Sequence, residues 1–189
     1  MAGRTDSWIL SDAAAAHGVA LEPPVLDRFE QAYLDRLRRE IETPGDSRKG
    51  VMPGVRELLD ALSARDDVYL ALLTGNYEKA ARIKLEYFDL WRYFRCGAFG
   101  DQAPDRNGLL PRALTTVASC GGPAFATTDA VVIGDTPLDI ECAKSSRARS
   151  IGVATGLHTV DDLRAAGADV VFTDLSDTED VLRAIDVQI

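Results

Sequence analysis

The sequence has few cysteines, no long apolar run and no signal-peptide pattern in its first residues. Its three cysteines, Cys96, Cys120 and Cys142, lie far apart in a chain of 189 residues. They have neither the paired spacing of a zinc site nor the even number of a disulfide framework, so we expect free, buried thiols. No stretch approaches the roughly 20 apolar residues of a membrane span, and the first residues lack the layout of a signal peptide. We therefore expect a folded protein of cytoplasmic type that does not associate with a membrane.

Positive charge is also scarce. The chain has 21 Lys and Arg residues against 30 Asp and Glu residues, a formal net charge of -9 at pH 7. Nucleic acids and anionic membranes are bound through clustered Lys and Arg, so we expect neither as a partner. A small-molecule partner is expected instead. It can be anionic, since a few local cations and backbone amides can bind phosphate on a protein that is acidic overall.

The N-terminal stretch lacks any strand signal. From Asp6 to Ile41 the sequence carries two helical patterns, with apolar residues at three- and four-residue spacing. The next segment, ETPGDSRKG from Glu42 to Gly50, is dense in Pro, Gly and charge, as exposed connections between domains are. We predict a helical cap subdomain over residues 1–49 and a core domain over residues 50–189.

In the core, apolar strands alternate with helices. The predicted strands are VYLALLT, CGAFG, AVVIGD, RSIGVAT and DVVFTD. This alternation indicates βαβ units, and therefore an α/β fold with a parallel sheet covered by helices on both faces. Ligands of such sheets bind beyond the carboxyl ends of the strands, so the residues after each strand are the candidate site. No Gly-x-Gly-x-x-Gly follows any strand, which excludes a dinucleotide-binding domain.

Two carboxylates follow the strand AVVIGD. Asp135 ends the strand, and Asp139 lies in the first turn of the next helix. Carboxylates that face one point suit Mg²⁺, which takes one or two of them together with waters and a phosphate oxygen. Asp139 has a second explanation, because Thr136 is a natural N-cap, Pro137 fits the first helical position, and Asp139 completes a capping box. Asp135 precedes the cap and is not explained in this way.

A hydroxyl and backbone amides follow the strand VYLALLT. Thr74, Gly75 and Asn76 stand at the start of a helix, where amides and the helix dipole bind anions. The same residues also read as a simple strand-to-helix turn capped by Asn76. Arg106, in the loop APDRNG, brings a fixed positive charge if it turns toward this edge, although loop arginines are usually solvated.

In this order the motifs resemble the haloacid dehalogenase (HAD) superfamily, over nearly the whole chain. LLTGN at residues 72–76 is similar to the second motif of the family, and VVIGDTPLD at residues 131–139 to the fourth. AKSSRARSIGVATG, at residues 143–156, is similar to the family's return to the sheet. The resemblance implies a Rossmann-like core and a Mg²⁺-dependent phosphohydrolase of the phosphoglycolate-phosphatase-like branch. It also implies a small phosphorylated metabolite as partner, in a monomer or a homodimer.

The resemblance also implies roles for the candidate residues. Thr74 binds the transferring phosphoryl group together with Gly75 and Asn76. Arg106 steadies the phosphoryl charge, since the usual Lys-Pro of the third motif is absent here. Asp135 binds Mg²⁺, and Asp139 supports that metal site. The helices before Gly50 resemble a cap inserted between the first and second motifs, which places the turn 4–6 near the substrate.

The sequence departs from the family at its front. Family members begin with an apolar strand ending in Asp-x-Asp, whose first carboxylate attacks phosphorus while the second acts as general acid and base. Nothing before Val68 has this form, and Asp6 and Asp12 lie in helical sequence. We expect the nucleophile segment to be encoded in frame within about 50 codons upstream of Met1, and the chain as given to be inactive.

Two other functions remain open. The alternative to a phosphohydrolase is a non-catalytic HAD-like protein that binds phosphate and metal. Dehalogenation fits the sequence less well, because that chemistry does not need the acids of the metal site.

Overall fold

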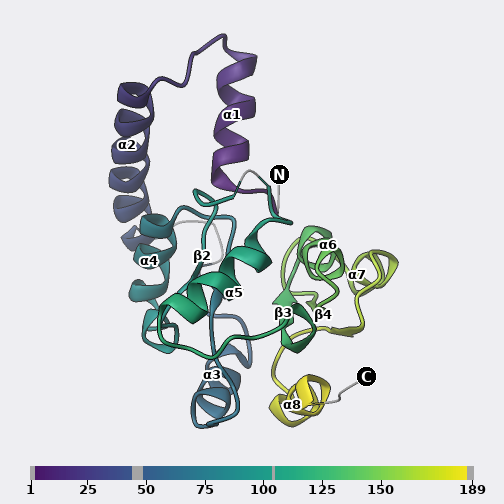
Figure 1. The fold of residues 1–189 in the computed structure, drawn as a ribbon. Coiled ribbons are helices and arrows are strands. Elements are labelled where there is room, and N and C mark those ends of the chain that lie inside the picture. The colour runs from purple at the N-terminus through teal and green to yellow at the C-terminus, as the bar shows by residue number, and fades with distance from the viewer. Residues whose placement is uncertain (1–2, 44–48, 104, 187–189) are drawn as a thin grey trace.

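The computed structural model describes residues 3–43, 49–103 and 105–186 (Figure 1). The first half contains α1 (Asp6–Ala16), α2 (Pro23–Glu42), α3 (Val55–Ser63), β1 (Leu72–Leu73), α4 (Glu78–Tyr87), η1 (Trp91–Tyr93) and β2 (Gly97–Ala98). The second half contains α5 (Leu109–Ser119), η2 (Thr127–Asp129), β3 (Val131–Gly134), α6 (Pro137–Ser145), β4 (Arg149–Val153), α7 (Val160–Ala165), β5 (Val170–Phe172) and α8 (Thr178–Asp186). Every predicted helix and strand is present, and the strands are shorter than predicted.

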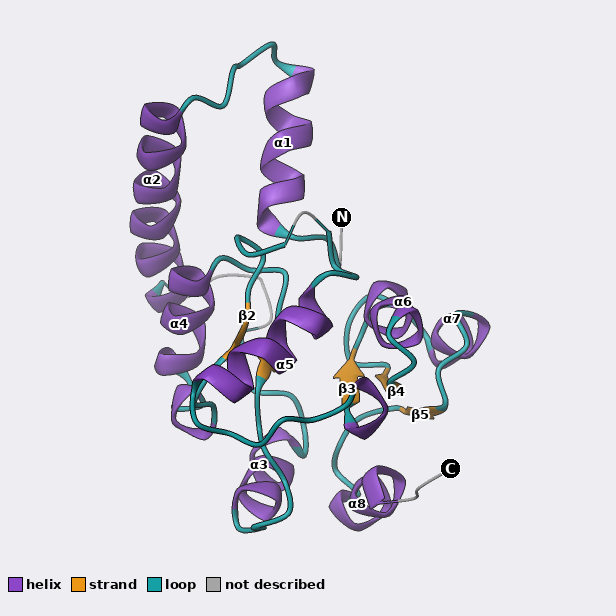
Figure 2. Ribbon diagram, in the orientation of Figure 1, coloured by secondary structure: helices purple, strands orange, loops and turns teal. Residues whose placement is uncertain are grey.

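The strands form two parallel sheets. β1 pairs with β2, with Leu72 opposite Gly97, and β4 lies between β3 and β5. Figure 2 shows β2 on one side of the molecule and β3, β4 and β5 on the other. The predicted α/β class with parallel strands is confirmed. The single expected sheet is divided, because among the described residues β1 and β3 each hydrogen-bond to only one neighbouring strand.

The helix α3 precedes β1 in the chain but packs under the second sheet. Its residues Leu58 and Leu62 are buried in one cluster with Ile151 of β4. The residue before α3, Gly54, packs closely against the backbone of Leu175. A Cβ added to Gly54, which has φ 77°, would lie 1.8 Å from the carbonyl oxygen of Leu175. Only glycine allows that approach and that backbone angle together.

The helix α5 joins the two sheets through its side chains. Leu109 is completely buried in a cluster with Ala98 of β2. The next residue, Leu110, is buried in a second cluster with Val132 of β3, and Leu73 of β1 packs against both clusters. The strand ends of both sheets are therefore held together, although no hydrogen-bond ladder among the described residues connects the sheets.

The three cysteines stand in different surroundings. Cys142 is completely buried in α6, Cys96 is partly buried just before β2, and Cys120 is exposed at the C-cap of α5. The expectation of buried thiols is therefore wrong for Cys120, because α5 ends at the surface.

The helices α1 and α2 stand away from the sheets, as Figure 1 shows at the top of the molecule. α2 begins with two prolines and packs along α4, yet only Leu34 of α2 is buried and Phe29 is 38% exposed. The predicted connection after α2 falls largely on residues 44–48, which lie outside the described residues, so the division at residue 49 stays a prediction. No described helix is both long and apolar enough to cross a membrane.

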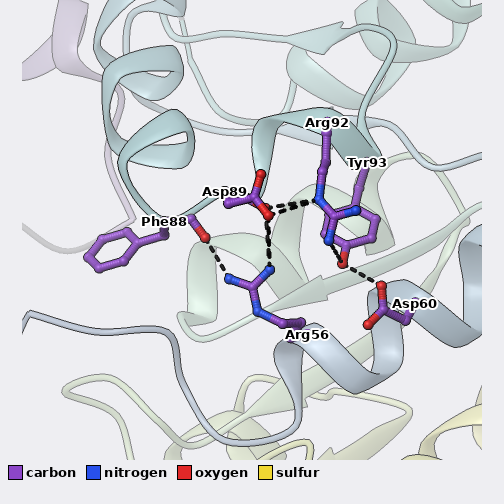
Figure 3. Close-up of polar contacts among 6 residues, drawn as sticks. All are labelled: Arg56, Asp60, Phe88, Asp89, Arg92 and Tyr93. Atoms are coloured by element: carbon purple, nitrogen blue, oxygen red, sulfur yellow. Dashed lines mark hydrogen bonds and ion pairs between the residues drawn. The ribbon is translucent and has the colours of Figure 1, made fainter.

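A polar cluster fixes the C-terminal end of α4 to α3 (Figure 3). Arg56 of α3 donates to the carbonyl oxygen of Phe88 at 2.6 Å, and its guanidinium lies 3.6 Å from the carboxylate of Asp89. Arg92 reaches the same carboxylate at 3.1 Å. Asp89 has φ 54°, an angle that Asp tolerates better than most residues, and it ends the helix there. The opposite, N-terminal end of α4 faces the candidate site.

Candidate functional site

The turn after β1 is built by the backbone of Thr74, Gly75 and Asn76. The amide of Thr74 makes the last ladder bond, to the carbonyl oxygen of Ala98 at 3.1 Å. The Thr74 hydroxyl accepts from the amide of Asn76 at 3.2 Å, which closes the turn. The predicted N-cap at Asn76 is wrong, because α4 begins one residue later and its N-cap is Tyr77.

A carboxylate from α1 occupies the N-terminal end of α4. Asp6 accepts from the amide of Tyr77 at 2.9 Å and from the side-chain nitrogen of Asn76 at 3.4 Å. Its own amide donates to the carbonyl oxygen of Gly75 at 2.7 Å, and the preceding Thr5 is completely buried. The turn 4–6 therefore lies against the end of β1, beside the candidate site.

The sequence reasoning missed Lys84. Its ammonium group donates to the side-chain oxygen of Asn76 at 2.9 Å, and burial lowers the pKa of Lys84. The available sequence signal was the spacing of Lys84 from Ala80 and Ala81 one turn earlier, and in the structure these alanines are buried on the same face of α4. A second cation thus stands beside the turn.

Arg106 lies between the two halves of the site. Its guanidinium is paired with the carboxylate of Asp139 and donates to the carbonyl oxygen of Gly3 at 3.1 Å. A Cβ added to Gly75 would lie 3.2 Å from the same guanidinium. The side chain of Arg106 is 12% exposed and that of Asp139 is 3% exposed. The arginine is therefore not a solvated loop residue but part of the strand-end cluster.

Asp139 has the structural role that local rules predict. One carboxylate oxygen accepts from the amide of Thr136 at 3.0 Å and from its hydroxyl at 2.8 Å, and Pro137 stands in the first turn of α6. The other oxygen is paired with Arg106. Both oxygens are engaged, so in this arrangement Asp139 orients its neighbours rather than reaching for a metal.

Asp135 is the open carboxylate of the cluster. It is exposed, and a Cβ added to Gly156 in the loop after β4 would lie 2.2 Å from its oxygen. Although the residue is exposed, neighbouring atoms desolvate its carboxyl group and raise the pKa of Asp135, and the nearby charge of Asp139 raises it further. Within the described residues no group of three or more His, Cys, Asp or Glu side chains is arranged to hold a metal. Mg²⁺ does not require one, since a single carboxylate with waters and a phosphate oxygen suffices.

The comparisons with known proteins bear on this arrangement. Residues 107–178 match the HAD-hydrolase-like family model. The chain is 30% identical to phosphoglycolate phosphatase of Agrobacterium fabrum over 160 residues, which is 85% of this chain and 65% of the relative. It is 31% identical to "Probable phosphatase IndB" of Dickeya dadantii over 135 residues, 71% of this chain and 57% of the relative. The chain is a homologue of the HAD-like hydrolases.

The HAD-like fold is also that of solved structures. A hydrolase from Pseudomonas syringae superimposes with a TM-score of 0.68 at 21% identity, and the match covers 98% of this chain and 81% of that one. The resemblance read from the motifs after β1 and β3 is thus confirmed. The chain spans less than two thirds of the length of the two phosphatase relatives named above.

Proposed function

We propose that this chain carries the phosphate- and metal-binding parts of a Mg²⁺-dependent phosphohydrolase. The reaction is hydrolysis of a small phosphorylated metabolite through an aspartyl-phosphate. The relatives named as phosphatases support a phosphate ester as the substrate class.

One observation carries this proposal. Arg106 lies beside the turn at Gly75 and pairs with Asp139, and the charges of Arg106 and Asp139 both act on Asp135. Residues that are separated by many positions in the chain thereby meet at one edge, beyond the carboxyl ends of β1 and β3. This is the place where parallel sheets bind ligands.

The residues of this edge suit a phosphoryl group. The Thr74 hydroxyl acts as an acceptor within the turn, so its proton can be donated to a phosphoryl oxygen. The Arg106 guanidinium supplies fixed charge, and Lys84 supplies a second positive charge held against Asn76. Preorganised cations of this kind stabilise the charge that develops during phosphoryl transfer.

Asp135 is the group that would hold Mg²⁺, with Asp139 in support behind it. When bound, the ion neutralises phosphoryl charge and polarises the phosphorus–oxygen bonds. Asp139 keeps Arg106 and Thr136 in place, which fixes the direction of the adjoining Asp135. The helices α1 and α2, with residues 1–49, would form the cap over this edge.

We infer that neither Asp6 nor Asp12 is the nucleophile. Asp6 is held by the amide of Tyr77, and Asp12 is paired with Arg4. We therefore expect residues 1–189 by themselves to bind Mg²⁺ and phosphate without hydrolysing a generic aryl phosphate.

Calorimetric titration of the purified chain tests the binding part of the proposal. Inorganic phosphate should bind in the presence of Mg²⁺ and more weakly in its absence. Asp135→Asn should abolish the Mg²⁺ dependence, because it removes a full ligand charge. Arg106→Ala should weaken phosphate binding at least tenfold, whereas Arg112→Ala, on the exposed face of α5, should not.

Three outcomes would contradict the assignment. Equal effects of Arg106→Ala and Arg112→Ala would show that Arg106 is not the cation of the site. Unchanged Mg²⁺ binding in Asp135→Asn would place the metal elsewhere. Hydrolysis of an aryl phosphate through a covalent intermediate would show that a carboxylate such as Asp6 or Asp12 is the nucleophile.

A further inference from the structure

The side chain of Asn76 lies between two opposite charges. Its amide nitrogen donates to Oδ1 of Asp6 at 3.4 Å, and its amide oxygen accepts from the ammonium group of Lys84 at 2.9 Å. A carboxylate can only accept hydrogen bonds and an ammonium group can only donate them. The two partners therefore leave the amide of Asn76 a single orientation, with its oxygen toward Lys84.

The carboxylate of Asp6 is itself held by three helices. Asp6 belongs to α1, and its Oδ2 accepts from the backbone amide of Tyr77 at the start of α4, at 2.9 Å. The hydroxyl of Tyr33, from α2, donates to the same oxygen at 3.5 Å. Burial, the charge of Asp6 and this hydrogen bond raise the pKa of Tyr33 to about 12, so the hydroxyl keeps its proton at neutral pH. The position of Asp6 is thus fixed without any help from Lys84.

Lys84 depends on this arrangement in two ways. Among the described residues its ammonium group has one hydrogen-bond partner, Asn76, which leaves two of its three N–H groups available to an anion. Burial lowers the pKa of Lys84, and the charge of Asp6 acts in the opposite direction. The direction of the ammonium group and its positive charge both trace back to Asp6.

We propose that Asp6 is a positioning residue, which acts through Asn76 to hold the ammonium group of Lys84 beside the turn 74–76. The inference rests on the proposed function, because the anion that Lys84 meets there is the phosphoryl group of the substrate. Asp6 belongs to α1 and receives a hydrogen bond from α2, so these two helices contribute to the phosphate site as well as standing above it.

The substitution Asp6→Asn isolates this role. The new side chain keeps the size of aspartate and an oxygen for the amide of Tyr77, so the fold should be retained. Its NH2 group takes the place of Oδ1 and faces Asn76, whose amide must then turn its oxygen toward residue 6. Lys84 meets an NH2 group in place of an acceptor, and it also loses the nearby negative charge.

An NMR titration of the full chain without ligand measures the effect, through the Cε signal of Lys84 assigned by its absence in Lys84→Met. Asp6→Asn should lower the pKa of Lys84 further. Asp12→Asn is the matched control, because Asp12 lies on the same helix and pairs with Arg4, and it should leave the titration unchanged. In an Asn76→Ala background the effect of Asp6→Asn should shrink, and an effect of undiminished size would overturn the role of Asn76.

Calorimetric titration with inorganic phosphate tests whether the effect reaches the ligand. Removing the charge of Asp6 acts directly on phosphate with or without Lys84, so the comparison is between the parent and a Lys84→Met background. Asp6→Asn should be less favourable to binding in the parent than in Lys84→Met by at least about threefold. Equal effects in the two backgrounds would overturn the proposal.

A measurement on the unaltered chain covers the case in which Asp6→Asn does not fold. The side-chain amide protons of Asn76 should exchange with water more slowly than those of Gln31, whose amide is bonded on the exposed surface of α2. Exchange at the same rate would show that Asp6 does not hold Asn76. If the unaltered chain binds no phosphate, the proposed function fails, and the pKa of Lys84 alone decides for or against the role of Asp6.

Discussion

At the scale of the residue, the pair of Arg106 and Asp139 has the largest expected effect on stability. Arg106→Ala leaves a carboxylate that is 3% exposed without its cation. The free energy of unfolding should fall by about 2–4 kcal/mol, since a buried charge that loses its partner keeps its desolvation cost. Urea denaturation measures this loss, and Arg112→Ala should stay within about 0.5 kcal/mol of the parent. A small loss for both would mean that Thr136 alone satisfies Asp139.

We expect the charged Lys84 side chain to lower the stability of the fold while strengthening phosphate binding. Because burial lowers its pKa, the charged ammonium costs folding free energy at neutral pH. The cost is complete below the folded-state pKa and disappears as the pH approaches the ordinary lysine value of about 10.4. Lys84→Met should therefore raise the melting temperature at neutral pH, with a gain that shrinks in alkali, and should weaken phosphate binding.

The matched control for Lys84 lies on the same helix. Lys79 is exposed and pairs with Glu30 on the surface. Lys79→Met should leave both the melting temperature and phosphate binding nearly unchanged. If Lys84→Met destabilised the protein instead, the hydrogen bond to Asn76 would outweigh the cost of burying the charge.

Local rules predicted some residues of the site and could not predict others. Thr136, Pro137 and Asp139 follow from capping preferences within one turn, and the structure reproduces them. The contacts of Asp6 with Tyr77 and of Arg106 with Asp139 join segments 71 and 33 positions apart. No periodicity encodes such pairs, because they depend on how the elements pack. Lys84 is an intermediate case. Its position on the inward face of α4 could be predicted from the spacing, but its contact with Asn76 could not.

At the scale of the element, Arg56 holds α4 against α3 (Figure 3). It donates to a carbonyl oxygen at the end of α4, where the last carbonyl groups lack partners within the helix. Arg56→Ala should lower the free energy of unfolding by about 1 kcal/mol, a value reduced because the side chain is 39% exposed. Chemical denaturation is the measurement. Arg36→Ala, which removes an exposed ion pair on α2, is the control and should cost less.

The order of the elements could be predicted from the sequence, but not their division into two sheets. α5 lies between the predicted strands CGAFG and AVVIGD, as the alternation predicts, and its buried residues Leu109, Leu110, Ala113 and Val117 form one face. Of the predicted strand VYLALLT, only Leu72–Leu73 forms a strand in the structure. Residues 68–71 do not pair with a neighbouring strand there. Strand pairing depends on which other strand lies alongside, and the composition of a single strand does not specify its neighbour.

At the scale of the whole molecule, the strands β1 and β3 present edges that can recruit other chains. Each hydrogen-bonds to one neighbour in the described structure, and Ile133 of β3 is 37% exposed. Unpaired apolar edges favour association. Residues 1–189 should therefore self-associate as the concentration rises, which light scattering during size-exclusion chromatography measures. A monomer with a single cooperative melting transition would show that the two sheets close on each other.

The position of α3 has a consequence for the integrity of the chain. It comes before β1 in the sequence, yet Leu58 and Leu62 are buried with Ile151, and the carbonyl oxygen of Leu175 rests on Gly54. The two halves of the chain thus interlock, so a protease cut in the largely exposed segment 121–124 should not separate them. The nicked protein should elute as one non-covalent complex and fall into two fragments only in denaturant. The continuity of the backbone at that point is dispensable once the protein has folded.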